Sequence, residues 1–187
     1  MQALTDRTVL VSGGAGTVGA ALCRLLVLEG ARVLIADGCV GVAEGVRLAD
    51  SLGRHARFEL LDTHSEREWV ATLADGVGRF GTLDALVLVE PDTLAVALAL
   101  RTAGPYLARS GGAAIGIARR DAADALGLAG IPVVELPEGP VSSAVAEHLA
   151  AVAMRYLQHG LRPSAPTAPS SREGGSAPSR SPRPSRA

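Results

Sequence analysis

A glycine-rich segment at residues 12–19, with the sequence SGGAGTVG, has the spacing of a dinucleotide-binding turn. A β-branched apolar run precedes it and a helical pattern follows it, so the turn is expected to join a strand to a helix. In that context Gly13 permits the tight turn, and Gly16 lets the backbone approach a pyrophosphate. Gly19 lets the helix pack closely against the strand. The N–H groups at the helix start are then expected to face the phosphates, along the positive end of the helix dipole.

An aspartate follows this turn at the spacing that a nucleotide site requires. Asp37 ends the second predicted strand, about 20 residues after the turn, where its carboxylate can accept hydrogen bonds from the adenosine ribose. The same carboxylate repels a 2′-phosphate, and Gly38 and Cys39 supply no arginine to hold one. The pattern therefore favours NAD(H) over NADP(H). The alternative is a strand–turn–helix unit that keeps its shape without a ligand.

A second aspartate, Asp62, ends the third predicted strand at the sheet edge where ligands sit in such folds. Its carboxylate could reach an adenine amino group, or could instead cap a helix or face solvent. The four histidines and two cysteines have no metal-ligand spacing, so no metal site is predicted, and Cys23 and Cys39 are interpreted as small core or helix residues. The residues expected to hold the cofactor are Ser12, Gly13, Gly16, Thr17, Val18, Gly19, Asp37, Asp62 and Val89.

Predicted strands alternate with predicted helices along most of the chain. The strands are expected at residues 8–12, 32–36, 57–61, 83–89, 113–118 and 131–136. The helices are expected at residues 17–29, 42–52, 65–78, 93–108, 121–128 and 142–158. The strands are continuous apolar runs, as expected when both faces of a sheet are covered. This pattern predicts an α/β fold: a Rossmann-type doubly wound parallel sheet of about six strands, with helices on both faces.

The composition divides the chain into a domain at residues 1–162 and a tail at residues 163–187. The tail is rich in Pro, Ser and Arg and has no large apolar residue, so we expect it to be disordered. Its net positive charge leaves open a weak anionic partner or serine phosphorylation. The whole chain carries a net charge of −1 and has no run long enough to span a membrane, so neither nucleic acid nor membrane is an expected partner. Without a leader pattern at the N-terminus, a cytoplasmic location is expected.

From about residue 8 to residue 162 the sequence resembles the short-chain dehydrogenase/reductase family. VSGGAGTVG resembles the glycine-rich loop of that family, Asp37 matches its NAD-selecting acid, and ELLDTHSEREW resembles the segment with its adenine-contacting aspartate, here Asp62. GTLDALVLV resembles the fourth strand of the family, GPYLARSGGAAIGIA the passage into the fifth, and YLQHGLR the end of the helix that normally carries the active site. The resemblance implies NAD binding and oxidoreductase chemistry.

The catalytic residues of the family, an asparagine, a serine, a tyrosine and a lysine, have no counterparts here. The sequence contains no lysine and no asparagine. The tyrosine and lysine positions fall near Glu138 and Ser142, and the serine position after the fifth strand reads Ala-Arg-Arg at residues 118–120. Glu-Pro-Asp at residues 90–92 replaces the usual Asn-Asn-Ala-Gly. Where the family continues with another strand, the tail begins, so the resemblance implies a truncated member.

Three functions remain open. The first is an NAD-binding pseudo-enzyme that acts as a regulator or as a partner subunit of an active relative, through the Ala-rich helices at residues 93–108 and 142–158. Small side chains there would allow close packing between subunits, but they could equally pack against the chain's own sheet. The second is an active oxidoreductase, isomerase or cyclase whose acid/base group is Glu90 or Glu138, because Tyr106 and Tyr156 are expected on helix surfaces. The third is a scaffold or degraded reading frame that binds nothing.

Overall fold

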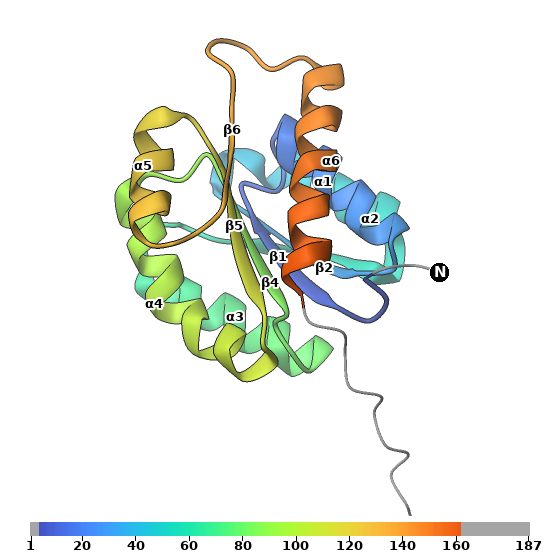
Figure 1. The fold of residues 1–187 in the computed structure, drawn as a ribbon. Helices are drawn as coiled ribbons and strands as arrows, with labels where there is room; N and C mark the ends of the chain where they lie inside the picture. The colour runs from blue at the N-terminus through green and yellow to red at the C-terminus, as the bar shows by residue number, and fades with distance from the viewer. Residues whose placement is uncertain (1–3, 162–187) are drawn as a thin grey trace, which may run out of the picture.

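The computed structural model describes residues 4–161, so the predicted tail at residues 163–187 lies outside the described residues. The described residues contain a six-stranded sheet in which every pair of neighbours is parallel, in the order β3-β2-β1-β4-β5-β6 (Figure 1). This confirms the predicted doubly wound fold. The strands are β1 (Thr8–Ser12), β2 (Arg32–Asp37), β3 (Ala56–Leu60), β4 (Ala85–Val89), β5 (Ala113–Ala118) and β6 (Val133–Glu135).

Helices cover both faces of the sheet. Helices α1, α2 and α6 lie on one face, and α3, α4 and α5 lie on the other (Figure 1). The α-helices are α1 (Thr17–Leu28), α2 (Val42–Leu52), α3 (Glu66–Phe80), α4 (Thr93–Ser110), α5 (Arg120–Leu128) and α6 (Ser143–Gly160), and short 3-10 turns lie at Cys39–Gly41 and Gly53–His55. Within residues 4–161, no helix combines the length and apolar character that a membrane crossing requires.

The two faces of the sheet are built from different apolar side chains. Side chains alternate along a strand, so neighbouring residues enter opposite layers. Val9 and Val11 of β1 contact the layer under α1 and α6, whereas Leu10 contacts the layer under α3 and α4. In β2, Ile35 and Leu34 divide in the same way. The strand pattern thus places β-branched side chains mainly on one face and leucines mainly on the other.

Both edges of the sheet carry features that oppose further strand pairing. At one edge, β3 itself carries two charged side chains, Arg57 and Glu59, which form an ion pair. At the other edge, Pro132 precedes β6 and has no N–H to donate. The observed β6 is three residues long, shorter than the strand expected at residues 131–136. The described sheet therefore ends in a charged strand on one side and a short one on the other.

A buried aspartate joins the start of β4 to the start of β1. Asp84 is 4% exposed. Its carboxylate accepts hydrogen bonds from Arg7 Nη1 at 2.6 Å, from the Thr8 backbone N–H at 2.9 Å and from Thr82 Oγ1 at 2.9 Å. Because the group is both charged and buried, these contacts must compensate for its lost hydration.

We expect Asp84→Ala to lower the free energy of unfolding by about 3 kcal/mol or more, because it removes a buried ion pair and the acceptor of a buried N–H group. Urea unfolding followed by fluorescence of the single, buried Trp69 would measure the change. The control is Asp75→Ala on the exposed face of α3, for which a change within about 0.5 kcal/mol is expected. Equal losses for the two variants would contradict this account of Asp84.

Candidate functional site

The reversal of strand order between β1 and β4 opens a groove at the carboxyl ends of the strands, the usual ligand position in such sheets. Three cavities that share lining residues follow this edge. The large cavity, about 550 Å³, is lined by Ser12, Gly13, residues 37–39 and 60–63, Glu68 and residues 89–92. The turn cavity, about 350 Å³, is lined by Gly13, Gly16, Thr17, Val18, Asp37, Val89, Glu90, Arg119 and Val141. The strand-end cavity, about 300 Å³, is lined by residues 90–93, Arg119 and Ala122.

The glycine turn owes three of its glycines, Gly13, Gly14 and Gly19, to packing within the protein. At Gly14 a Cβ would lie 2.8 Å from the Val11 carbonyl oxygen. Gly13 has a left-handed backbone (φ 73°), and a Cβ there would lie 2.6 Å from the Val89 carbonyl oxygen. At Gly19 a Cβ would overlap the Gly13 carbonyl oxygen and come within 2.7 Å of the Gly14 Cα. These positions need glycine so that α1 can approach the end of β1. They would need it with or without a ligand.

Gly16 differs from its neighbours in the turn. It lines the turn cavity and is the N-cap of α1, with extended backbone angles (φ −68°, ψ 169°) that any residue can adopt. A Cβ there would meet one atom of the described protein, the Gly13 carbonyl oxygen, at an ordinary contact distance of 3.5 Å. No side chain caps the first turn of α1, which contains no acidic residue. The packing of the described residues therefore gives no reason for glycine at position 16.

Asp37 both supports the turn and lines the cavities. Its Oδ2 accepts a hydrogen bond from the Ala15 backbone N–H at 2.9 Å, and its Oδ1 accepts one from Gly38 at 2.8 Å. The residue is half-buried and lines both the large cavity and the turn cavity. A carboxylate offers about four acceptor positions. Two of them are used here, so Asp37 can accept further hydrogen bonds from the cavity side.

Asp62 lines the large cavity, as expected, and it makes hydrogen bonds with neighbouring residues that the sequence did not predict. Its Oδ1 accepts from the His64 backbone N–H at 2.9 Å, and its own N–H donates to Glu68 Oε2 at 2.6 Å. The cap of α3 is Ser65, whose hydroxyl accepts from the Glu68 N–H, so Asp62 does not have the helix-capping role considered from sequence. Asp62 and Glu68 bring two carboxylates to this cavity.

The segment after β4 carries a strained residue and a second helix cap. Glu90 has a left-handed backbone (φ 49°) that is uncommon for a residue other than glycine, and its N–H donates to Ile117 at 2.8 Å. Asp92 caps α4 through the Ala95 N–H and pairs with His64. These two contacts, the Ala95 hydrogen bond above all, lower the pKa of Asp92 below its ordinary value.

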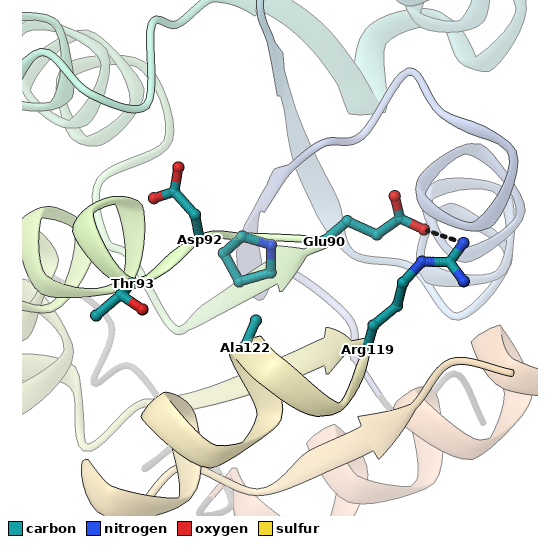
Figure 2. A pocket seen from close by; sticks show the side chains of 6 residues that line it. Glu90, Asp92, Thr93, Arg119 and Ala122 are labelled. Atoms are coloured by element: carbon teal, nitrogen blue, oxygen red, sulfur yellow. Dashed lines mark ion pairs between the residues drawn. The ribbon is translucent and has the colours of Figure 1, made fainter. Parts of the chain in front are cut away.

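Arg119, the residue directly after β5, extends into this groove (Figure 2). Its guanidinium donates to the Pro137 carbonyl at 2.9 Å and to the Gly139 carbonyl at 3.2 Å, and it faces Glu90 at 3.6 Å. From sequence, Arg119 is one of three residues, Ala-Arg-Arg at 118–120, that stand at the serine position of the family, and no role was assigned to it. Its place directly after a predicted strand was the signal that could have marked it, because carboxyl strand ends meet at one edge.

The remaining candidates lie elsewhere. Glu138 and Tyr156 are exposed, and neither lines any of the three cavities. Tyr106 is half-buried against the core and Arg109, and it lines none of them either. Cys23 is buried, and burial raises the pKa of its thiol to about 12. The interpretation of Cys39 as a core or helix residue was wrong in part, because it lies in a 3-10 turn, exposed and lining the large cavity. Among residues 4–161, no group of His, Cys, Asp or Glu side chains could hold a metal ion.

A comparison with family models matches residues 7–89 to the short chain dehydrogenase family. The matched region extends from just before β1 to the end of β4 and thus contains the glycine turn, Asp37 and Asp62. The resemblance seen in sequence from residue 8 to residue 162 is supported at family level over this first half.

Curated relatives match a similar length. A 3-beta-hydroxysteroid dehydrogenase of Comamonas testosteroni is 39% identical over 84 residues, which are 45% of this chain and 32% of the relative. A cis-4-hydroxycyclohexanecarboxylate dehydrogenase of Sinomonas cyclohexanicum is 34% identical over 86 residues, 46% of this chain and 34% of the relative. The chain therefore spans about a third of the length of these relatives.

A solved structure extends the likeness to the whole fold. A chain from Novosphingobium aromaticivorans, described as a short-chain dehydrogenase, superposes with a TM-score of 0.70 and 17% identity. The match covers 83% of this chain and 79% of that one. At this identity the likeness concerns the fold, and it extends past β4 into the half that the family model does not match.

We expect Gly19→Ala to lower the free energy of unfolding by about 1–3 kcal/mol, because the added methyl group would overlap the backbone of the turn. The matched control is Gly78→Ala in α3, where a Cβ would meet no atom within 4 Å. That change should stabilise the protein by about 0.5–1 kcal/mol, because alanine suits a helix better than glycine. Urea unfolding of both variants is the measurement, and a stable Gly19→Ala protein would contradict the close contact.

Proposed function

We propose that this chain is a member of the short-chain dehydrogenase family and that it binds NAD(H) in the groove at the carboxyl ends of its strands, without the usual catalytic residues of that family. The bound nicotinamide cofactor would supply a hydride donor or acceptor. The residues of this chain would hold it: the turn at residues 12–19, Asp37 and Asp62 on the adenosine side, and Val89 at the end of β4. In this proposal the protein acts as a regulator or as a partner subunit of an active relative.

The observation that carries the proposal is the glycine at position 16. Packing and backbone angles explain Gly13 and Gly19, whereas Gly16 has space for a Cβ and ordinary backbone angles, and its N-cap position would accept Ser, Thr, Asp or Asn equally well. A ligand that approaches the N–H groups at the start of α1 supplies a reason for glycine, because a side chain at this position would stand in its path. The helix dipole favours an anionic group there, and no acidic side chain in the first turn opposes one.

Asp37 supports the preference for NAD(H). Its carboxylate is held in place by the Ala15 N–H, and it lines the two cavities that adjoin the turn. A 2′-phosphate at this point would meet a fixed negative charge. Cys39, which lines the large cavity together with Asp37, offers no positive charge to compensate.

The partner role does not depend on the alanines of α4 and α6. Ala95, Ala99 and Ala103 of α4 are buried in the chain's own core, as are Ala146 and Ala150 of α6. These small side chains are used for packing on the sheet, which was the alternative considered from sequence. A partner subunit would therefore contact the outer faces of these helices.

Calorimetric titration tests the binding proposal. We expect the purified protein to bind NAD⁺ at least about tenfold more tightly than NADP⁺, and Asp37→Ala to weaken NAD⁺ binding by about ten- to a hundredfold, the usual effect of losing a hydrogen bond to a charged group. Gly16→Ala should abolish binding and lower the free energy of unfolding by no more than about 1 kcal/mol, the usual cost of alanine at an N-cap.

Asp75→Ala, on the exposed face of α3, is the matched control for a lost carboxylate and should bind NAD⁺ like the wild type. Absence of binding heat with both nucleotides would contradict the proposal. Normal binding by Gly16→Ala would remove its main support.

A second candidate, an enzyme with altered acid/base chemistry, is favoured by one observation at Glu90. This residue keeps a strained backbone at the end of β4 and lines all three cavities, and strain of this kind gathers at active sites. Its carboxylate could act as the proton acceptor in place of the missing tyrosine.

NADH oxidation in the presence of oxosteroids and oxocyclohexanecarboxylates, the ketones that correspond to the alcohols in the relatives' names, separates the two candidates. For a pseudo-enzyme we expect no turnover above background. Turnover that falls by about 10²–10⁴-fold in Glu90→Gln would favour the enzyme instead. Glu138→Gln is the control, because Glu138 is exposed and lines none of the three cavities.

A further inference from the structure

The groove is an unfavourable place for a phosphate group by charge alone. Among the residues that line the three cavities, one is basic, Arg119. Carboxylates are much more numerous: the acidic lining residues are Asp37, Asp62, Glu68, Glu90 and Asp92. A dinucleotide carries a negative charge on each of its two phosphates, so it must be attracted at a specific point to enter this groove.

The arginine is already held in position before any ligand binds. Hydrogen bonds to the carbonyls of Pro137 and Gly139 fix two of its N–H groups, and the ion pair with Glu90 at 3.6 Å directs it across the groove (Figure 2). A guanidinium has five N–H donors. The Glu90 contact is too long for a hydrogen bond, so the remaining donors are available to an anion.

The place of Arg119 also selects which phosphate it can reach. Arg119 lines the turn cavity together with Gly16, Thr17 and Val18, and it lines the strand-end cavity. Asp37 shares the turn cavity with Arg119, but the strand-end cavity, which Arg119 also lines, contains neither Asp37 nor Asp62. Arg119 does not line the large cavity, which contains both of these adenosine-side residues. A group bound at the turn would have the start of α1 and the guanidinium as neighbours in one cavity.

We propose that Arg119 is a cofactor-binding residue that contacts the phosphate farther from adenosine, and that it supplies the positive charge which this acidic groove otherwise lacks. This inference rests on the proposed binding of a dinucleotide. It gives a role to one residue of the Ala-Arg-Arg segment at residues 118–120, which stands where the family places its catalytic serine. It also explains why the guanidinium is fixed by backbone carbonyls: a donor set that is already ordered loses less entropy on binding.

Calorimetry with two probes tests the inference. ADP-ribose carries both phosphates, and AMP carries the adenosine-side phosphate alone. We expect Arg119→Ala to weaken ADP-ribose binding by about ten- to a hundredfold, the usual effect of losing a charge-assisted contact, and to change AMP binding by less than about twofold. The matched control is Arg120→Ala, since Arg120 is the next residue, carries the same charge and lines none of the three cavities. It should bind both probes like the wild type.

The outcomes separate the two proposals. If Arg119→Ala and Arg120→Ala bind ADP-ribose equally well, or if Arg119→Ala weakens AMP to the same extent, the inference about Arg119 fails while dinucleotide binding stands. If the wild type binds neither probe nor NAD⁺, the proposed function fails and the inference with it. Circular dichroism checks that each variant is folded. Should Arg119→Ala not fold, Arg119→Gln keeps a hydrogen-bond donor for the loop carbonyls without the charge, and the same loss of ADP-ribose affinity is expected.

Discussion

The close approach of α1 to the end of β1 is the constraint on which the rest of this structure depends. Gly19 brings the helix against the Gly13 carbonyl, and Gly13 in turn lies against the carbonyl of Val89. These contacts fix the start of α1 relative to both central strands. The position of the groove follows, because its walls are the ends of those strands. Any ligand site at this edge is therefore set by backbone contacts that leave no room for a Cβ.

Asp37 extends this constraint to the second strand. Its carboxylate accepts the N–H of Ala15 within the turn, and the same residue lines the cavity where a ribose is expected. Support of the turn and selection of the nucleotide would thus be combined in one side chain. A substitution at Asp37 changes both, whereas Gly16 can be changed without disturbing any packing in the described chain. This difference makes Gly16 the more informative position for the binding question.

Local patterns predicted most of the fold, and they failed where contacts are distant in sequence. Strand and helix signals are carried by neighbouring residues, so β1 and α2 were placed at their observed bounds, and the glycine turn was found from spacing alone. The contact of Arg119 with the loop at residues 137–139 depends on how β5, β6 and α6 meet. The pairing of His64 with Asp92 joins two loops 28 residues apart, which no periodicity encodes. The start of the helix expected at residues 65–78 was placed correctly, but the Glu68 carboxylate in its first turn accepts from the Asp62 N–H, which lies before the helix.

The two edges of the sheet have a consequence for the behaviour of the protein at high concentration. An open sheet edge is a template on which a second chain can add a strand, and this is a common route to aggregates. Here one edge presents the Arg57–Glu59 pair, and the other is a strand of three residues preceded by proline. Neither offers a long, uncharged row of backbone donors and acceptors. Self-association of the described domain should therefore proceed through helix surfaces rather than through continuation of the sheet.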